Sequence, residues 1–430
     1  MAAGDRGVRI LILTNFYPPA DAGWGYMQLC EEVADGLSAR GHDIAILTST
    51  HRNGPEPSRP YPVYRLLDLD PDWQSGRSAA RQFFVGRRWR EKQGIAHLHR
   101  LTADFRPEII FIWHAMGLPR ALLHRAESLP DASVVYYLAG YLPEWPDEYL
   151  AYWQRRPVRP LARLLKAPMR WLALRLLAWE GKPVPLRFEH VICVSHYVRQ
   201  RLQEQHLIPD SAVVIHNGVD INTFAPAERS WNAEADVVLL YAGRLEPEKG
   251  VHTLLEALPL LSSSARGRIR EVRLVGEGEP DYVQRLQRLA QSCDPYPRSS
   301  RQTNEWITFW PSVTREAMPA QLSQADILVM PSMLEALSRM IQEAMAVGLL
   351  VIGTTAGGNG ELLEHERTGL VFEPGDARGL AAQLERALKN PALAAQLAAA
   401  GQRSVRTSFR IDQTISKVEA YLQHLVAFPQ

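Results

Sequence analysis

The sequence predicts an α/β protein built from two domains, and three observations support this. The chain has 430 residues, which is too long for one hydrophobic core and fits two domains of about 200 residues each. Short apolar runs of strand length alternate with helical stretches, a pattern typical of parallel sheets covered by helices. Apolar residues make up 46% of the chain, so both domains have ample material for a core.

Charge and cysteine content narrow the class of protein. The formal net charge is +1, so the chain has no global field for a polyanion, and we expect no nucleic-acid partner. Cys30, Cys193 and Cys293 have neither paired nor metal-like spacing, which favours a reducing compartment. The first apolar run has the length of a strand rather than of a signal-peptide core, and no stretch is long enough to span a membrane. These features predict a cytoplasmic protein.

The amino-terminal half predicts a parallel sheet. In such sheets, ligands bind outside the carboxyl ends of the strands. After the first strand, Gly23 and Gly25 precede a helix and allow the backbone to approach a phosphate or a sugar at its amino end. The alternative is a plain strand-to-helix turn. The predicted strands span residues 8–13, 43–48, 109–113, 134–138 and 191–194.

A cationic cluster follows a strong strand prediction at residues 236–243. Arg244 leaves the carboxyl end of this strand, and Lys249 stands at a helix amino end, where free backbone N–H groups favour anions. A planar guanidinium and a point charge together suit a diphosphate. The alternative is that Glu246 and Glu248 neutralise both cations on a solvated turn.

Two glutamates, Glu335 and Glu343, lie where an apolar run at 327–330 leads into a helix that Ser338 can cap. If all eight steps between them were helical, the carboxylates would lie about 12 Å apart and on different faces. This spacing argues against a shared metal ion or a shared proton. It suits an extended, hydroxyl-rich ligand, because carboxylates accept strong hydrogen bonds from the vicinal hydroxyls of ribose and hexose.

Together these clusters resemble a known family. The strings YAGRLEPEKGVHTLLEAL (241–258) and E-x7-E, the latter followed by AMAVG and a glycine-rich turn, are similar to the carboxyl-terminal domain of family 4 glycosyltransferases. VICVSHYVRQRL, IHNGVDINTF, VGEGEPDYVQRL and RTGLVFEPGD match other family segments in the same order. The resemblance implies the GT-B fold, with two facing Rossmann-like domains and a cleft between them. It implies an acceptor-binding domain at 1–220, a nucleotide-sugar-binding domain at 221–410, and a last helix at 411–430 that crosses back to the first domain.

The resemblance also implies an activity. The family moves a sugar from a nucleoside-diphosphate sugar to a hydroxyl acceptor such as a glycan, a glycolipid or a small molecule, with retention and without a cofactor or metal. Arg244 and Lys249 would stabilise charge on the departing diphosphate, and Glu335 would contact the donor sugar. The remaining donor-binding residues that it implies are Gly23, Gly25, Gly243, Glu343, Gly357 and Gly358.

The chain departs from the family pattern where Trp24 separates two glycines that are usually adjacent, and again on the acceptor side. Many members carry a histidine after the strand matching 134–138, where this chain has Ala139-Gly140-Tyr141. His114 and Glu144 are the candidates for the acceptor side. The missing histidine leaves open a non-catalytic, glycosyltransferase-like subunit. A nicotinamide-dependent oxidoreductase is a third hypothesis, but the first strand is followed by no G-x-G-x-x-G.

A basic amphipathic stretch at 155–176 suits contact with an anionic membrane or an anionic acceptor. It would place the protein on the inner face of the membrane. The alternative is a surface helix whose leucines pack on its own domain. Pro168 is expected to kink or divide this helix.

Overall fold

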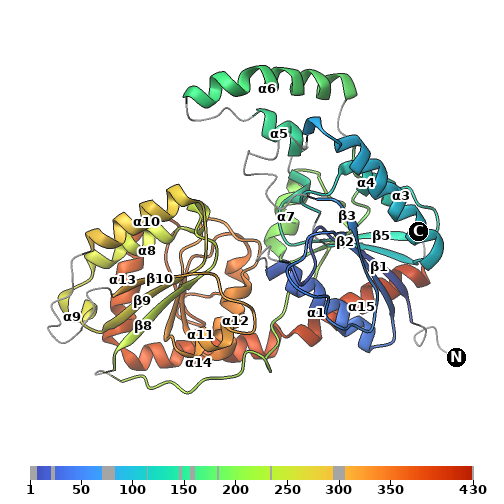
Figure 1. Ribbon diagram of the computed structural model, residues 1–430. Helices are drawn as coiled ribbons and strands as arrows, with labels where there is room; N and C mark the ends of the chain where they lie inside the picture. Colours follow the sequence, from blue (N-terminus) through green and yellow to red (C-terminus); the bar gives the residue numbers. More distant parts are fainter. Residues whose placement is uncertain are drawn as a thin grey trace. The chain divides into compact units, whose positions relative to one another are not determined.

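A computed structural model describes residues 7–20, 25–69, 83–113, 115–144, 148–154, 160–181, 184–232, 235–293 and 306–428, with the backbone alone at 148 and 160–165. The chain divides into two compact units. Unit 1 comprises Met1–Val194, Val198–Ile215 and Ile415–Gln430, and unit 2 comprises Ser195–Tyr197 and His216–Thr414. Each unit is a parallel sheet with helices packed on it (Figure 1). The predicted fold class, two Rossmann-like domains, is therefore confirmed.

Unit 1 holds a seven-stranded parallel sheet in the order β3-β2-β1-β4-β5-β6-β7. The central strand β1 pairs with β2 through Ile10 and Ile44, and with β4 through Ile10 and Ile109. All five predicted strands of this half are present. The strands are β1 (Arg9–Leu13), β2 (Asp43–Ser49), β3 (Val63–Leu67), β4 (Ile109–Ile112), β5 (Ser133–Leu138), β6 (His190–Cys193) and β7 (Val213–Val214).

The helices of unit 1 cover this sheet or extend from it. Pro168 lies inside one continuous helix, so the expectation that it divides the helix is wrong; Pro168 is exposed, and its one missing hydrogen bond is tolerated there. The helices are α1 (Gly25–Ala39), α3 (Arg87–Phe105), α4 (Arg120–Glu127), η2 (Leu142–Glu144), α5 (Glu148–Gln154), α6 (Pro160–Glu180), α7 (His196–Glu204) and α15 (Ile411–Ala427). The first two residues of α7 are assigned to unit 2.

The last helix, α15, returns to unit 1 from residue 415 onward. A Cβ atom on Gly36 of α1 would overlap Ile415, so the two helices are in close contact. Arg40 Nη1 lies 2.5 Å from Glu419 Oε2, and His42 Nε2 lies 3.0 Å from Glu419 Oε1. These contacts attach the carboxyl terminus of the chain to its amino-terminal sheet.

Unit 2 holds a six-stranded parallel sheet in the order β10-β9-β8-β11-β12-β13. β8 pairs on one side with β9, the next strand in sequence, and on the other side with β11. The strand order therefore reverses between β8 and β11. Such a switch point opens a crevice at the carboxyl edge of the sheet. The strands are β8 (Val237–Ala242), β9 (Ile269–Val275), β10 (Ile307–Trp310), β11 (Ile327–Met330), β12 (Leu350–Gly353) and β13 (Leu370–Val371).

The helices of unit 2 pack on both sides of its sheet. None of the helices among the described residues of either unit is both long and apolar enough to cross a lipid bilayer. The helices of unit 2 are η3 (Pro247–Lys249), α8 (Val251–Ala257), η4 (Leu258–Leu260), α9 (Ser263–Arg266), α10 (Pro280–Ser292), α11 (Met318–Ser323), α12 (Arg339–Val347), η5 (Gly357–Glu361), α13 (Ala377–Lys389) and α14 (Pro391–Ser408).

Candidate functional site

The switch point of unit 2 brings two loops into contact. β8 pairs with β11 through Leu239 and Ile327, so the loops that follow these strands leave the same edge of the sheet. Gly250 has φ 65°, and a Cβ atom there would overlap the carbonyl oxygen of Pro331. The backbone N–H of Met333 donates to the carbonyl oxygen of Glu248 at 2.8 Å. The cationic and acidic segments of the sequence are therefore packed backbone to backbone.

Lys249 and Glu335 form the centre of this contact. Lys249 Nζ lies 2.6 Å from Glu335 Oε1, and the side chains are 18% and 15% exposed. Ser332 Oγ donates to the same carboxylate oxygen at 3.0 Å. Two donors on one oxygen hold Glu335 in a fixed orientation at the carboxyl edge of the sheet.

Arg244 is placed differently. Its Nη1 lies 2.6 Å from Glu246 Oε1, and its side chain is 47% exposed. The alternative of neutralisation by neighbouring glutamates is thus observed for Arg244, whereas Lys249 pairs with a residue 86 positions away. Because Arg244 is half exposed, its guanidinium stays accessible to a further anion.

Glu343 lies on α12, which begins at Arg339 after Ser338 caps it by accepting from the N–H of Ile341. Glu335 precedes this helix, so the spacing of a continuous helix does not apply to the two glutamates. The side chain of Glu343 is 8% exposed, and Arg339 Nε lies 3.7 Å from its Oε1. Burial raises the pKa of Glu343, and the nearby charges of Arg339 and Arg315 act in the opposite direction.

The glycines after β12 contact the backbone of Glu335. The N–H of Gly358 donates to the carbonyl oxygen of Glu335 at 3.0 Å. Gly357 has φ 66°, and a Cβ atom there would overlap that same carbonyl oxygen. A Cβ atom on Gly358 would overlap the carbonyl oxygen of Ala336. Gly357 and Gly358 thus let the turn pack directly against the Glu335 backbone. Gly243 has φ 153°, and a Cβ atom on Gly276 would overlap its carbonyl oxygen.

Two candidates of the amino-terminal half, Gly23 and His114, lie outside the described residues. Gly25 is described and is the first residue of α1. Glu144 is described, and both its oxygens are engaged by Arg201 of α7, at 2.5 Å from Nε and 2.8 Å from Nη2. The hydrogen bond from Arg201 holds the pKa of Glu144 below its usual range. Glu144 therefore serves unit 1 as the partner of Arg201.

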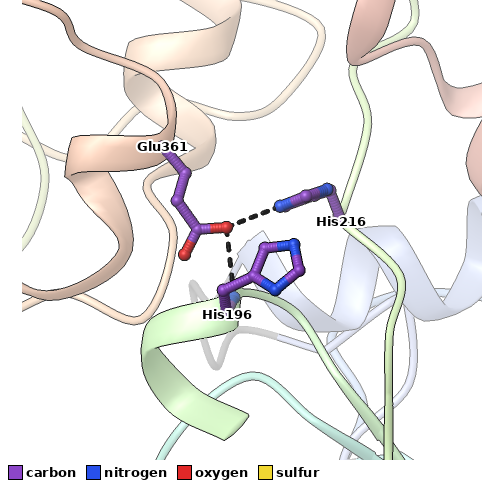
Figure 2. A group of neighbouring side chains, drawn as sticks. All are labelled: His196, His216 and Glu361. Atoms are coloured by element: carbon purple, nitrogen blue, oxygen red, sulfur yellow. Dashed lines mark hydrogen bonds and ion pairs between the residues drawn. The ribbon is translucent and has the colours of Figure 1, made fainter. Parts of the chain in front are cut away.

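A cluster of His196, His216 and Glu361 in unit 2 was missed by the sequence analysis (Figure 2). Glu361 accepts from the backbone N–H groups of His196 at 3.1 Å and Tyr197 at 3.0 Å, and its Oε2 lies 2.7 Å from His216 Nε2. Although burial raises the pKa of Glu361, these hydrogen bonds prevail and lower it. The potential ligand atoms lie within 4.8 Å of one another, a donor set that suits zinc. The carboxylate is already satisfied by protein N–H groups, so its observed role is to cap the first turn of α7.

Ser195, next to this cluster, is also engaged in unit 2. Its Oγ donates to the carbonyl oxygen of Ala336 at 2.8 Å. Ser195, which lies in the segment VICVSHYVRQRL (191–202), thus contacts the residue directly after Glu335 within unit 2. The only sequence signal for this contact was the family resemblance of the segment.

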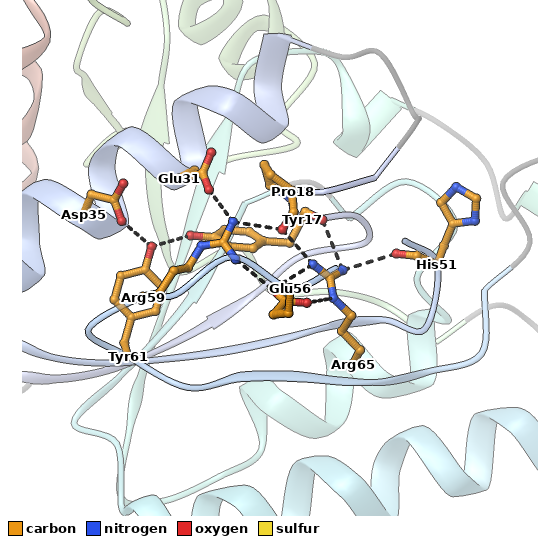
Figure 3. Close-up of polar contacts among 9 residues, drawn as sticks. All are labelled: Tyr17, Pro18, Glu31, Asp35, His51, Glu56, Arg59, Tyr61 and Arg65. Carbon is orange, nitrogen blue, oxygen red and sulfur yellow. Dashed lines mark hydrogen bonds and ion pairs between the residues drawn. The ribbon is translucent and has the colours of Figure 1, made fainter. Parts of the chain in front are cut away.

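A buried polar network fixes the loop after β1 in unit 1 (Figure 3). Arg65 donates to the carbonyl oxygens of Tyr17 at 3.1 Å, Pro18 at 2.6 Å and His51 at 3.2 Å. Arg59 also donates to the Pro18 carbonyl, at 3.0 Å, and Glu56 pairs with both arginines. The side chains of Arg59 and Arg65 are 6% and 9% exposed. The network therefore fixes the described part of this loop, which ends at residue 20, a few positions before α1 begins at Gly25.

Comparisons with known proteins cover both units. The family model described as Glycosyltransferase Family 4 matches residues 28–223, and that described as Glycosyl transferases group 1 matches residues 226–404. YtcC of Bacillus subtilis is 29% identical over 212 residues, 45% of this chain and 50% of that protein, so the chain spans about half of that relative. A GDP-mannose-dependent alpha-(1-6)-phosphatidylinositol monomannoside mannosyltransferase of Mycobacterium tuberculosis is 28% identical over 341 residues, 76% of this chain and 78% of that protein. The structure of Anabaena HepE in complex with UDP-glucose has the same fold, with a TM-score of 0.63 at 19% identity, covering 97% of this chain and 100% of that one.

Proposed function

Because the chain belongs to glycosyltransferase family 4 and has the two Rossmann-like domains of the GT-B class, we propose that it moves a sugar from a nucleoside diphosphate to a hydroxyl acceptor, with retention and without a metal ion. Glycosyltransferase activity itself follows from the family. The donor class, the stereochemistry and the roles of individual residues are the proposal.

The observation that carries this proposal is the ion pair of Lys249 and Glu335 at the switch point. Departure of a nucleoside diphosphate builds negative charge on its phosphates, and a fixed ammonium group lowers the energy of that state. Lys249 precedes Gly250, the N-cap of α8. Arg244 adds an exposed guanidinium at the same edge. With two cations present, the leaving group needs no divalent ion.

Glu335 is proposed to orient the donor sugar. The hydrogen bond from Ser332 and the pair with Lys249 both act on its Oε1 and fix the direction of the carboxylate, from which it would accept from a sugar hydroxyl. When the diphosphate engages Lys249, the carboxylate gains freedom to accept from the sugar. Glu343, which lies four residues after the start of α12, is proposed to accept from the ribose hydroxyls. The glycine turn at Gly357 and Gly358 keeps Glu335 in place.

The relatives support a nucleotide-sugar donor and leave its identity open. HepE was crystallised with UDP-glucose, and the mycobacterial relative is GDP-mannose-dependent. UDP-glucose and GDP-mannose are both nucleoside-diphosphate hexoses, and they differ in the base and in the sugar. That relative acts on a phosphatidylinositol monomannoside, so a glycolipid is within the acceptor class proposed here. We assign acceptor binding to unit 1, and we propose a cytoplasmic location with contact to the inner face of the membrane.

The test is a turnover assay over a panel of nucleoside-diphosphate sugars, with and without hydroxyl acceptors. We expect one donor to release nucleoside diphosphate, equally well in the presence of a chelator, and NMR of the product to show the anomeric configuration of the donor. Lys249→Ala should lower kcat about 100-fold. Lys389→Ala is the matched control, because Lys389 also forms a 2.5 Å ion pair, with Glu385, away from the switch point.

A non-catalytic subunit is the competing function, and the absent histidine after β5 is the observation that favours it. It would bind nucleotide sugars or an acceptor without turnover. Release of nucleoside diphosphate by the purified wild-type chain, abolished in Lys249→Ala, would exclude it. Binding without release across the whole panel would exclude the transferase instead.

A further inference from the structure

Exposed apolar side chains are concentrated in one part of unit 1. Among the described residues, eleven large apolar side chains are exposed, and six of them lie in two short segments at 85–89 and 169–179. Three of the six are tryptophans, which are 62–77% exposed. Contiguous exposed apolar surface of this kind marks a site of interaction. The six are Val85, Trp89, Met169, Trp171, Leu172 and Trp179, and we refer to them as the α3–α6 surface.

The two segments lie side by side. Arg87 and Arg88, at the start of α3, both pair with Glu180 at the end of α6; Arg88 Nη2 lies 3.0 Å from Glu180 Oε1. The guanidinium of Arg88 also lies over the ring of Trp179, 5.6 Å from its centroid. These contacts make one continuous surface from segments that are 80 residues apart in sequence.

The opposite side of α6 is the side that packs on unit 1. Phe83, Trp153 and Ala173 form a buried cluster, against which Leu174, Leu176 and Leu177 pack. Arg170 Nε donates to the carbonyl oxygen of Trp153 at 2.7 Å, and Lys166 Nζ lies 3.4 Å from Tyr152 Oη. The helix is thus anchored through leucines and two of its cations. Trp171, Leu172 and Trp179 remain uncovered and face away from this cluster.

The charge around the α3–α6 surface is positive. Between residues 160 and 180 the sequence holds four basic residues and a single acid, Glu180, which already pairs with two arginines. Arg175 is exposed beside Trp171, with its guanidinium 5.2 Å from the ring centroid. Arg88 has a side chain that is 58% exposed. Exposed tryptophan next to exposed arginine matches the boundary of a bilayer, where rings lie among headgroups and cations meet phosphates.

We infer that the α3–α6 surface binds an anionic bilayer, with its tryptophans among the headgroups and Arg88 and Arg175 on lipid phosphates. The partner is a lipid surface rather than a second copy of the chain, because the one acid of α6, Glu180, is already engaged by Arg87 and Arg88 and so does not complement Arg175 in a symmetric dimer.

The position of this surface in unit 1 bears on the acceptor. α5 and α6 follow the carboxyl end of β5, and α3 begins after the carboxyl end of β3; Phe83 joins them through its ring contact with Trp153, 5.4 Å between centroids. The α3–α6 surface therefore belongs to the ligand-binding edge of this sheet. If the proposed function holds, a hydroxyl acceptor carried by a lipid would reach unit 1 from the bilayer that this surface binds.

Vesicle binding tests the inference directly. The wild-type chain should sediment with vesicles of phosphatidylcholine mixed with phosphatidylglycerol, and much less with phosphatidylcholine alone. The double variant Trp171→Ala/Trp179→Ala should lose about tenfold or more in partitioning. Trp310→Ala is the matched control, because Trp310 is 40% exposed on unit 2, and it should bind as wild type.

The electrostatic part has its own pair of variants. Arg175→Glu should weaken binding to the anionic vesicles, and added salt should reduce the difference from wild type. Arg403→Glu, an exposed change of equal charge on α14, should have no effect. Vesicle binding that survives the double tryptophan variant, no vesicle binding by the wild type, or a dimer that the tryptophan variant dissociates would each overturn the inference.

Transfer measurements keep this outcome separate from that of the proposed function. Lys249→Ala should bind vesicles as the wild type does, because Lys249 lies in unit 2. The double tryptophan variant should keep donor turnover with a water-soluble acceptor when no vesicles are present. Loss of turnover alone would count against the transferase, and loss of vesicle binding alone would count against the membrane contact.

Discussion

Gly357 lies against the carbonyl oxygen of Glu335 so closely that a Cβ atom on Gly357 would overlap it. The neighbouring N–H of Gly358 donates to that same oxygen at 3.0 Å. The orientation of Glu335 therefore depends on a turn that follows β12, a strand on the far side of β11 from Lys249. The site at the switch point is held from both sides.

Gly357→Ala is expected to displace Glu335 and to lower both stability and transfer. The backbone at Gly357 has φ 66°, which costs a non-glycine residue about 1 kcal/mol before any steric overlap. We expect a fall in Tm and a loss of kcat, measured by thermal unfolding and by nucleoside diphosphate release. Gly360→Ala is the control: the nearest atom to its added Cβ would be 3.5 Å away, so Tm and kcat should stay near wild type. Equal effects of the two changes would contradict the proposed support of Glu335.

Glu343→Gln is expected to weaken donor binding without lowering stability. Burial raises the pKa of Glu343 in the folded state, so ionisation of this carboxyl costs folding free energy. This cost is absent below the unfolded pKa and grows as the pH rises through the folded pKa. The neutral glutamine avoids the cost, and the Arg339 pair that it weakens is long, at 3.7 Å. At pH 8, Tm should equal or exceed that of wild type.

The same variant should bind the donor about 10–100-fold more weakly, because a charge-assisted hydrogen bond to ribose contributes about 1.5–3 kcal/mol. Titration with the nucleoside diphosphate measures this. Glu373→Gln, an exposed acid in the same unit, is the control and should leave affinity unchanged. A lower Tm together with unchanged affinity would show that Glu343 is a structural partner of Arg339 alone.

The sequence predicts those strands and contacts that depend on residues close together in the chain. Apolar runs with flanking turns predicted the central strands, because burial on both faces leaves a clear pattern in residues such as 109–113. The two-residue strands β7 and β13 carry no such pattern. Arg244 pairs with Glu246, two positions away. This ion pair could be predicted because the two opposite charges are neighbours in sequence.

Contacts across the sheet could not be predicted in this way. Lys249 meets Glu335 because β8 and β11 are neighbours in the sheet, although two strands separate them in sequence. His196, His216 and Glu361 also come together from distant parts of the sequence, with separations of 20 and 145 residues. Strand order is a property of the whole fold, and single-chain patterns of charge or hydrophobicity do not encode it locally.

Glu144→Gln is expected to lower stability in a pH-dependent manner and to leave donor turnover unchanged. Arg201 lowers the pKa of Glu144, so the ionised pair stabilises the fold above the unfolded pKa, and this contribution is lost as the pH falls through the folded pKa. The variant should therefore have a lower Tm than wild type at pH 7, by an amount equivalent to about 1–2 kcal/mol. The difference should shrink toward pH 3. A constant difference across that range, or a loss of turnover without loss of Tm, would assign Glu144 another role.

Arg65→Lys is expected to raise the KM for the acceptor and to leave the KM for the donor unchanged. Arg65 donates from one planar group to three carbonyl oxygens, those of Tyr17, Pro18 and His51, and lysine has neither the fork nor the reach to replace all three. The described part of the loop after β1 should then lose its fixed course at the carboxyl edge of the sheet in unit 1. Steady-state kinetics with each substrate varied in turn measures the split. Arg100→Lys, whose side chain is 83% exposed on α3, is the control and should match wild type. A change in the donor KM would contradict the assignment of acceptor binding to unit 1, because Arg65 contacts unit 1 alone among its described hydrogen-bond partners.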